Sequence, residues 1–353
     1  MRLCYFAEAA SVHVQRWAGW FARRGHEVHL VSLSLRDLPG IRVHPFPAGN
    51  LLAFPRKVLA VRRIVREIAP DLIHSHQAIG YGLWGAVAGY HPFVVSAWGS
   101  DVLVRPKESW VQRPVLRFVL RRADYCIPVA PHMLASLVPF GLRMDRCQAI
   151  PMGVELDTFP PLRFRRGTRA PWFISTRALE PLYDVKTLVR ASRDIFAANP
   201  EIRGTILGDG SERDGLKALA TRLGVMDRLR IEGAQPPERV MQALASARVY
   251  VSTAKSDGAS VSLMEAMAWG CFPVVTDIPA NREWVVDGVN GSLFPVGDVQ
   301  ALAAQVTRAL RDEDLLESAS EKNLQQVRER GDLGVNLARV EKIYQDLVKE
   351  VRR

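Results

Sequence analysis

One stretch of the chain, which reads SDGASVSLMEAMAWG, concentrates the residues best suited to chemistry. Ser260 precedes an apolar helical pattern and can cap it. The free N–H groups of Val261 and Ser262 would then form an anion site at the start of the helix, large enough for a diphosphate. Two carboxylates belong to the same stretch, Asp257 before the cap and Glu265 within the helix. The stretch therefore predicts a site for a phosphorylated ligand.

Each carboxylate also has a purely structural interpretation. The run Ser262-Leu263-Met264-Glu265 has the S-x-x-E spacing of a capping box, in which Glu265 would serve the helix instead of a ligand. Asp257 could equally be a loop aspartate in a solvated turn. Neither residue is therefore assigned from its local sequence alone.

Two histidines and a glycine-rich turn are further candidates. His74 and His76 lie two residues apart at the end of an expected strand, so their rings project to one face. A metal pair is conceivable, but no carboxylate or third imidazole lies nearby in the sequence, and we see no D-x-D motif. We expect no metal ion. The Gly208-Asp209-Gly210 turn permits close approach of the backbone to a ligand, or is simply a tight turn after a strand.

Alternating strands and helices must position these residues. The expected strands are 3–6, 27–31, 72–74, 93–96, 172–175, 204–207, 229–231, 249–251 and 273–275. The expected helices are 12–24, 57–68, 79–90, 185–197, 215–223, 240–246 and 261–269. Such βαβ repetition predicts parallel sheets with helices on both faces, and ligands bind such sheets at the carboxyl ends of the strands.

A length of 353 residues favours two domains at about 150 residues each. A Pro- and Arg-rich passage, Phe159–Gly167, interrupts the alternation and resembles a linker. We therefore expect one doubly wound domain over residues 1–162, a second over 163–335, and a final helix over 336–353.

The composition, 48% hydrophobic and 24% charged, is that of an ordinary globular protein. Four cysteines far apart favour a reducing cytoplasm over a disulfide framework. Glu8 interrupts the first apolar run, so we expect no secretion signal and a mature N-terminus. Residues 77–100 lack charge, but five glycines and His91-Pro92 favour a buried helix and strand over a membrane span.

The net charge of +10 lies mostly in residues 1–160, which hold 19 basic and 11 acidic side chains. Two segments, Arg56–Arg66 and Trp110–Arg122, interleave arginine with apolar residues at helical spacing. Such a surface can rest on anionic lipid, or it can be a solvated helix face, and both interpretations stay open. We expect no nucleic-acid partner, because no zinc-finger, basic-zipper or RNA-recognition signature is present.

The stretch around Asp257 resembles glycosyltransferase family four of the GT-B fold. In that family an acidic residue, seven intervening residues and a glutamate precede a pattern like A-M-A-x-G-x-P-V-V. Asp257 and Glu265 occupy the two acidic positions, although glutamate is usual at the first. Further similarities, in the family's order, are Gly25–Val28, Asp71–His76, Gly99–Asp101, Ala123–Asp124, Ile150–Val154, Gly208–Gly210, Glu265–Ala268, Pro273–Val275 and Asn290–Phe294.

The resemblance implies a fold and a set of donor contacts. The fold would be two Rossmann-like domains facing across a cleft, with the C-terminal helix crossing back to the first. Glu265 would accept hydrogen bonds from the ribose hydroxyls of a sugar nucleotide, Asp257 would bind the transferred sugar, and Arg177 would bind the diphosphate.

A lysine expected five residues after Arg177 is replaced by Leu182. Lys186, Lys255 or the backbone alone must then complete the diphosphate site. The family's donor contacts extend to the backbone at Gly208 and Gly210, and to Ala234 beside the nucleobase.

In the first domain, the resemblance implies that His76 lies beside the reacting sugar and that Ser100 and Asp101 line the acceptor side. Asp101 could instead cap a turn. The first loop, with Ser11 and His13, would also face the acceptor, although it lacks the glycine pair common in the family.

The resemblance thus implies a retaining hexosyltransferase that uses a nucleotide diphosphate sugar, most simply UDP-linked. The acceptor would be a hydroxyl of a glycan or lipid-linked molecule, as in polysaccharide or lipopolysaccharide biosynthesis. No cofactor or metal is implied, and a cytoplasmic protein, peripheral on the inner face of the plasma membrane, is expected. The alternatives are a GT-B sugar-nucleotide epimerase or hydrolase, and a catalytically silent sugar-nucleotide-binding subunit.

Overall fold

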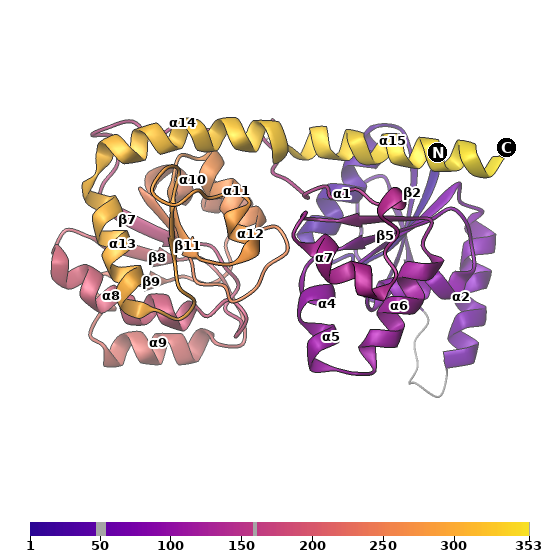
Figure 1. Ribbon diagram of the computed structural model, residues 1–353, viewed down its shortest axis with the longest axis horizontal. Helices are drawn as coiled ribbons and strands as arrows, with labels where there is room; N and C mark the ends of the chain where they lie inside the picture. Colours follow the sequence, from indigo (N-terminus) through magenta and orange to yellow (C-terminus); the bar gives the residue numbers. More distant parts are fainter. Residues whose placement is uncertain (47–53, 158–160, 353) are drawn as a thin grey trace. The chain divides into compact units, whose positions relative to one another are not determined.

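A computed structural model describes residues 1–46, 54–157 and 161–352 (Figure 1). The chain divides into two compact units. One comprises Met1–Met152 and Gly334–Arg353, and the other comprises Gly153–Leu333. Each unit has its own parallel sheet covered by helices.

The first unit contains six parallel strands in the order β3-β2-β1-β4-β5-β6. The strands are β1 (Arg2–Phe6), β2 (Glu27–Ser32), β3 (Ile41–Pro45), β4 (Leu72–His76), β5 (Phe93–Ala97) and β6 (Tyr125–Pro128). The helices are α1 (Val12–Arg23), α2 (Phe54–Ile68), α3 (Tyr81–Ala88), α4 (Ser100–Leu103), α5 (Arg105–Glu108), α6 (Gln112–Arg122), α7 (Met133–Leu137) and α15 (Leu333–Arg352). The strand order reverses beside β1, which makes the sheet doubly wound.

Strand β4 shows how the two faces of this sheet are covered. Alternate side chains of a strand point to opposite faces. His74 lies 5.7 Å from the ring of Tyr344 on α15 (centroid to centroid), so α15 covers its face. The next residue, Ser75, faces α3, where a Cβ on Gly85 would lie only 2.2 Å from its hydroxyl oxygen. Gly85 therefore lets α3 pack directly on the sheet.

Helix α15 packs against α1 and the turn that follows it. The rings of Phe21 and Tyr344 stack with centroids 5.3 Å apart. Glu341 accepts a hydrogen bond from Arg24 at 2.9 Å and contacts His26 at 2.7 Å. The final helix of the chain therefore belongs to the first unit.

The second unit contains six parallel strands in the order β12-β11-β10-β7-β8-β9. The strands are β7 (Trp172–Ser175), β8 (Arg203–Ile206), β9 (Leu229–Ile231), β10 (Val249–Ser252), β11 (Phe272–Thr276) and β12 (Ser292–Phe294). The helices are α8 (Val185–Ala198), α9 (Arg213–Arg222), α10 (Pro237–Ser246), α11 (Val261–Ala268), α12 (Pro279–Arg282), α13 (Val299–Arg311) and α14 (Glu313–Arg330).

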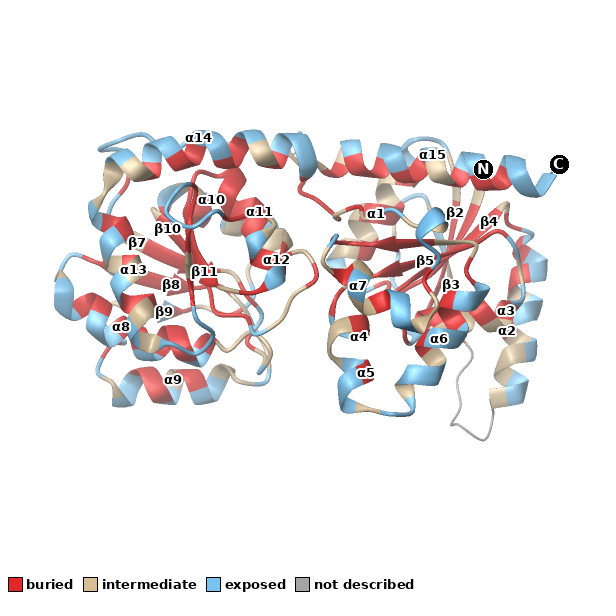
Figure 2. Cartoon of the chain, in the orientation of Figure 1, coloured by how far each residue is buried: buried red, intermediate tan, exposed pale blue. Residues whose placement is uncertain are grey.

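Two apolar cores flank this second sheet, and its strands are buried on both faces (Figure 2). Phe173 and Val249 pack in the core formed with α8, α9 and α13. The adjacent residues Ile174 and Tyr250 pack in the core formed with α10, α11 and α14. Burying each such aliphatic or phenylalanine side chain stabilises the fold by about 1.5–3 kcal/mol.

Every strand and helix expected from the sequence is present, but the strands β3, β6 and β12 and the helices α4, α5, α7, α12, α13 and α14 were not predicted. The units divide at Met152/Gly153, ten residues before the predicted boundary at 162/163. Val154 donates a backbone hydrogen bond to Gly331 at 2.7 Å, which attaches this segment to the second unit.

Part of the predicted linker is docked on the second unit. Arg163 binds Glu321 of α14 at 3.0 Å, and the Gly167 N–H donates to Glu313 at 2.7 Å. Residues 159 and 160 of the predicted linker lie outside the described residues. Among the described helices, none combines the length and apolarity that a bilayer crossing demands.

Candidate functional site

An arginine-centred cluster lies where strands β7 and β10 end. Arg177 donates from Nη2 to the Asp257 carboxylate at 2.7 Å, and from Nη1 to the hydroxyls of Ser260 at 2.6 Å and Ser262 at 2.9 Å. Arg177 is 7% exposed. Four residues predicted from separate parts of the sequence thus meet in one hydrogen-bonded group, which we call the Arg177 cluster.

The sheet explains why these residues meet. Strands β7 and β10 are parallel neighbours, with Phe173 opposite Val249, so their carboxyl ends lie at the same edge. Arg177 follows β7, and the loop after β10 carries Asp257 before it enters α11 at Ser260. Parallel pairing therefore brings together two loops that are about 80 residues apart in the chain.

Ser260 caps α11 as predicted. Its hydroxyl oxygen accepts a hydrogen bond from the Leu263 N–H at 3.2 Å. Glu265 consequently lies two residues beyond the N3 position of this cap, and the capping-box interpretation of the Ser262–Glu265 spacing is wrong. Glu265 is 8% exposed within a buried helix, where a carboxylate is costly unless it has partners.

The electrostatics of the Arg177 cluster keep the guanidinium charged. Burial is the largest single influence and would lower the pKa of Arg177, but Asp257, Tyr250 and Tyr183 together outweigh burial and the pKa is raised. The guanidinium carbon also lies 4.1 Å from the ring centroid of Tyr183, a cation–π contact. Tyr250 contacts Ser262 at 2.9 Å through its hydroxyl, and burial raises the Tyr250 pKa. The Arg177 guanidinium is therefore held in one position and is largely shielded from solvent.

One N–H of this buried arginine lacks a partner. Arg177 Nε has no hydrogen-bond partner among the described residues, and the atom is inaccessible to solvent. Such a donor is costly to leave unpaired. It is the kind of group that an anionic ligand satisfies.

The two predicted glycines serve contacts between loops. A Cβ on Gly208 would lie 2.1 Å from the Arg177 carbonyl oxygen, and one on Gly210 would lie 2.5 Å from the Leu179 carbonyl oxygen. The Leu179 N–H donates to Asp209 at 2.9 Å. These glycines therefore allow the loop after β8 to lie directly against the loop that carries Arg177, which accounts for both without a ligand.

Three other predicted donor residues lie at the surface. Lys186 is exposed in the first turn of α8, Val261 is half-buried at the start of α11, and Ala234 is exposed in the loop after β9. Lys255 lies beside the loop before α8, with its backbone N–H bound to the Leu182 carbonyl at 2.9 Å.

In the first unit, His76 is enclosed by aromatic rings. Its ring lies 5.0 Å from that of Trp17 and 5.5 Å from that of Tyr5, and Trp98 covers another side at 5.0 Å. His76 is 1% exposed, and burial lowers its pKa to about 3. Neither ring nitrogen has a hydrogen-bond partner among the described residues. His76 is therefore neutral, with a donor and an acceptor both unused.

His74 differs from its neighbour because its ring is fully bonded. It contacts the Tyr344 hydroxyl through Nδ1 and the Ser96 hydroxyl through Nε2 at 2.8 Å. The rings of His74 and His76 lie 4.7 Å apart, so the prediction that they share one face is confirmed. The His74 side chain therefore has a structural role, because it packs the sheet against α15.

Asp101 joins two loops at the same edge. Its carboxylate accepts hydrogen bonds from the N–H groups of Ala78 at 2.6 Å, Trp98 at 3.0 Å and Gly99 at 2.9 Å. It is 2% exposed, and burial raises its pKa in spite of these bonds. The three bonds favour the turn-capping interpretation over contact with an acceptor.

The remaining predicted acceptor residues are more accessible. Ser100 is exposed at the start of α4, and Ser11 precedes α1 without bonding it through the side chain. His13 on α1 meets the Trp98 ring edge-on at 6.2 Å. Trp98 thus links the predicted acceptor loop to His76.

A hydroxyl and two acids were missed by the sequence analysis. Tyr250 lies inside a strand and Glu8 in the first loop, where Tyr81 donates to its carboxylate at 3.2 Å. Asp184 lies before α8, bound by the Thr187 hydroxyl at 2.8 Å. The sequence signal that could have indicated Glu8 and Asp184 is their position in loops that follow predicted strands.

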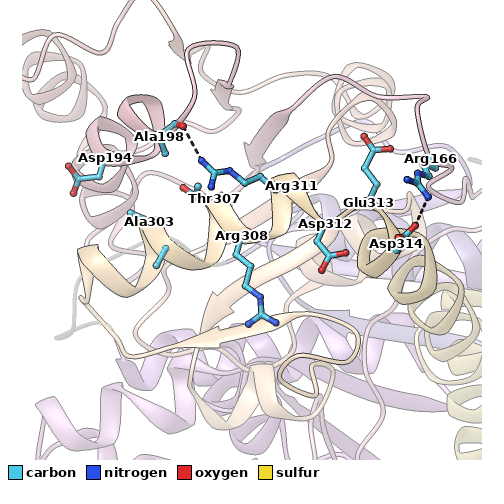
Figure 3. Close-up of a pocket in the computed structure, with 11 residues that line it drawn as sticks. Arg166, Asp194, Ala198, Ala303, Thr307, Arg308, Arg311, Asp312, Glu313 and Asp314 are labelled. Carbon is cyan, nitrogen blue, oxygen red and sulfur yellow. Dashed lines mark hydrogen bonds and ion pairs between the residues drawn. The ribbon is translucent and has the colours of Figure 1, made fainter.

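A cavity of about 1000 Å³ occurs elsewhere in the second unit, where it is lined by residues of α8, α13 and the start of α14 (Figure 3). It is lined by both acids and bases, including Arg308, Arg311 and Asp194, and by none of the predicted site residues. Across the described ranges, His, Cys, Asp and Glu form no group of three or more that could hold a metal ion.

Comparison with known proteins identifies two family matches. The family described as "Glycosyl transferases group 1" matches residues 163–326, and "Glycosyl transferase 4-like" matches residues 2–129. A D-inositol 3-phosphate glycosyltransferase of Acidothermus cellulolyticus is 27% identical over 354 residues, spanning 87% of this chain and 79% of that protein.

Two solved structures are similar throughout. The sucrose-phosphate synthase of Thermosynechococcus elongatus has a TM-score of 0.86 at 18% identity, covering 99% of this chain and 100% of that one. HepE of Anabaena, solved in complex with UDP-glucose, has a TM-score of 0.83 at 18% identity, covering 98% and 100%. The chain therefore has the GT-B fold and belongs to the family-four glycosyltransferases.

Proposed function

We propose that this glycosyltransferase retains configuration while transferring a hexose from a nucleotide diphosphate sugar, UDP-linked, to a hydroxyl of a glycan or lipid-linked acceptor. The observation that carries the proposal is the Arg177 cluster. It combines a fixed cation with one unpaired N–H, two hydroxyls and the start of α11. A nucleoside diphosphate is the ligand whose chemistry uses all of these groups.

The leaving group determines what the site must do. A diphosphate leaves without a proton from a buried acid, so the reaction needs stabilisation of the growing negative charge. Arg177 supplies a guanidinium whose positive charge is shared with Asp257, and the N-terminus of α11 supplies about half of a positive charge. Asp257 holds the guanidinium in place at 2.7 Å, and in this proposal its second carboxylate oxygen binds the transferred sugar. Glu265 binds the ribose hydroxyls.

His76 completes the proposal on the acceptor side. Its two unused ring nitrogens can donate to one hydroxyl and accept from another. A neutral imidazole suits a sugar, because sugar hydroxyls carry no charge at working pH. Ser11, His13 and Ser100 are the accessible polar groups at that edge. Asp101 holds the loop that leads to Ser100, because its carboxylate accepts hydrogen bonds from the Trp98 and Gly99 N–H groups.

The UDP-linked donor is proposed because HepE, with the same fold, was solved with UDP-glucose. A panel of UDP-, GDP- and ADP-sugars, screened by thermal shift and followed by mass analysis of products, tests it. A glycosylated acceptor supports transfer. Free sugar indicates a hydrolase, an altered sugar nucleotide indicates an epimerase, and binding without turnover indicates a silent subunit.

No metal ion enters this proposal, because the charge on the leaving diphosphate is offset by Arg177 and α11. Prolonged treatment with a chelator should therefore leave turnover intact. Activity that disappears with chelator and returns with Mn²⁺ would refute the metal-independent part.

Peripheral attachment to the inner face of the plasma membrane is the last part of the proposal. The buried side of α6 is apolar, through Leu116, Val119 and Leu120. Trp110, just before the helix, is 82% exposed, and Phe118 is 40% exposed beside Arg122. The arginines of this segment, which we call the α6 arginines, are Arg113, Arg117, Arg121 and Arg122.

Sedimentation with anionic vesicles at moderate salt tests this attachment. Each basic residue near such a surface contributes about 1 kcal/mol, so reversing the α6 arginines to glutamate should abolish cosedimentation. The matched control reverses four exposed arginines of the second unit, namely Arg190, Arg193, Arg222 and Arg308. Equal sedimentation of the two variants would exclude the α6 arginines as the contact.

A further inference from the structure

Three hydroxyl groups form a chain of contacts beside the guanidinium of Arg177. The side-chain oxygens of Ser260 and Ser262 lie 3.1 Å apart, and the Tyr250 hydroxyl lies 2.9 Å from that of Ser262. Each hydroxyl has one proton to donate and two lone pairs with which to accept. The other contacts of the Arg177 cluster therefore determine the direction in which each of these protons points.

The direction of the hydroxyl chain is set at Ser260. Its oxygen accepts from the Leu263 N–H at 3.2 Å and from Arg177 at 2.6 Å, so both of its lone pairs are occupied. In the contact between the two serines, Ser260 must therefore be the donor. Ser262 also accepts from Arg177 at 2.9 Å, which occupies both of its lone pairs as well. Ser262 consequently donates its own proton to Tyr250, where the chain ends.

We propose that Tyr250 is a positioning residue for the diphosphate, because its hydroxyl can reverse this chain. When Tyr250 donates to Ser262, it takes the lone pair that Ser260 used, and the Ser260 proton loses its acceptor. The O–H groups of both serines then point to an anion at the start of α11. The reversal needs only rotation of hydroxyl groups, and no proton is transferred. This inference rests on the proposed function, which supplies the anion.

The burial of Tyr250 and Ser262 fits these roles. Tyr250 is 0% exposed, so it is shielded from a ligand and acts through Ser262. Ser262 is half-buried in the first turn of α11, where a ligand can reach it. Burial raises the pKa of the Tyr250 phenol, so the group keeps the proton that it donates.

The sheet holds the Tyr250 ring in place. In the parallel pairing of β10 with its two neighbours, Tyr250 lies opposite Ile174 of β7 and Pro273 of β11. Its ring packs in the core formed with α10, α11 and α14. A phenylalanine ring at this position has the same shape and would occupy the same space. Tyr250→Phe therefore removes the hydroxyl and little else.

The experiment measures binding of UDP, GDP and ADP, each beside its own nucleoside, by titration calorimetry on the full chain. For the diphosphate that binds, Tyr250→Phe should weaken affinity about tenfold, the lower end for a hydrogen bond to a charged group, because only one serine O–H still points to the anion. Affinity for the nucleoside should stay as in the wild type. The control, Ser192→Ala, removes a buried hydroxyl that donates to the Leu188 carbonyl within α8, and it should keep both affinities.

A double-mutant cycle tests whether Tyr250 acts through Ser262. Ser262→Ala removes the hydroxyl that Tyr250 contacts, so adding Tyr250→Phe to this variant should weaken diphosphate affinity no further. If the two losses instead multiply in the double variant, Tyr250 does not position Ser262 and the proposal is wrong.

Two further results overturn the proposal. Equal diphosphate affinity in Tyr250→Phe and wild type shows that the direction of the hydroxyl chain does not affect binding, although the proposed function stands. Equal losses of nucleoside and diphosphate affinity, with a melting temperature below that of Ser192→Ala, assign Tyr250 to core packing alone. If the wild-type protein binds none of the three diphosphates, the proposed function fails together with this inference.

Discussion

The carboxyl edges of the two sheets carry opposite kinds of polar group. The edge of the second sheet holds the buried ion pair of Arg177 and Asp257, with two serine hydroxyls bound to the same guanidinium. The edge of the first sheet holds His76, buried and neutral among aromatic rings. The carboxylate at this edge, Asp101, accepts hydrogen bonds from backbone N–H groups.

The contrast indicates a different task for each unit, although both units have the same fold. A permanent charge buried in a low-dielectric setting is useful only toward a charged partner, and it is costly without one. A neutral imidazole with unused nitrogens suits uncharged hydroxyls. In the proposed function, the edge of the second unit would bind phosphate and the edge of the first unit would bind hydroxyl groups, although both units have the same doubly wound plan.

The largest expected effect comes from breaking the ion pair. Arg177→Gln should lower turnover about 10²- to 10³-fold, because a charge that stabilises the leaving group is lost. It should also destabilise the second unit by about 3–5 kcal/mol, because Asp257 stays buried without its partner. Steady-state kinetics and calorimetric unfolding measure the two losses.

The double variant Arg177→Gln/Asp257→Asn is the control that separates these losses. It leaves no unpaired charge, so most of the stability should return while turnover stays low. If turnover recovers together with stability, Arg177 holds the loops and does not stabilise the leaving group, and the contrast between the two edges disappears.

A smaller effect is expected at Glu265. Glu265→Gln keeps the size of the side chain but replaces a charged acceptor by a neutral one. Donor affinity should weaken by about 1.5–3 kcal/mol with little change in melting temperature. A 2′-deoxyribose donor should lose most of this sensitivity, because one hydrogen-bond partner is already absent.

Titration calorimetry with both donors measures these changes in affinity. The capping-box explanation does not compete, because the residue that caps α11 is Ser260. An unchanged dissociation constant for Glu265→Gln would take this residue out of the site.

The strands were predicted where the sequence pattern was strong. Buried strands such as Phe272–Thr276 are continuous apolar runs between turn residues, whereas β3 contains Arg42, His44 and Pro45 and is only partly buried at the sheet edge. β12 has three residues. Helix α14 carries charge on most turns, so its apolar stripe is weak. Edge strands and polar helices lack the periodic signal on which such prediction depends.

The members of the site were predicted better than their contacts. Local sequence identified Ser260 as the cap, and the resemblance supplied Arg177, Asp257 and Glu265. Which side chains pair with one another depends on the register of β7 and β10, a long-range property. The approach of Lys255 to Leu182 joins loops 73 residues apart and has no local signal. The enclosure of His76 by Trp17 and Trp98 likewise depends on α1 and β5 packing on β4.

The smallest effect on donor binding is expected at the first edge, where His76→Phe should leave diphosphate affinity unchanged. The substitution should instead change how the stability of the folded protein depends on pH. The pKa of His76 in the folded protein is about 3, below the value of about 6.5 in an unfolded chain. As the pH falls through 6.5, the unfolded chain binds a proton that the folded protein does not bind until about pH 3, so stability is lost across this window. At pH 5 the loss from this one group is roughly 2 kcal/mol.

Phenylalanine fills the same aromatic enclosure without titrating. His76→Phe should therefore reduce the loss of stability between pH 7 and pH 5, measured by calorimetric unfolding, while His74 continues to contribute, because burial lowers its pKa as well. Ser246→Ala, at an exposed position of α10 in the other unit, removes no titratable group, so it should keep the wild-type pH dependence and serves as the control. Should wild type and His76→Phe lose stability equally between these pH values, His76 is not a buried neutral base. Its imidazole would then gain a proton on acidification in the folded protein as it does in the unfolded chain, and the assignment of a permanently neutral group to the first edge would not hold.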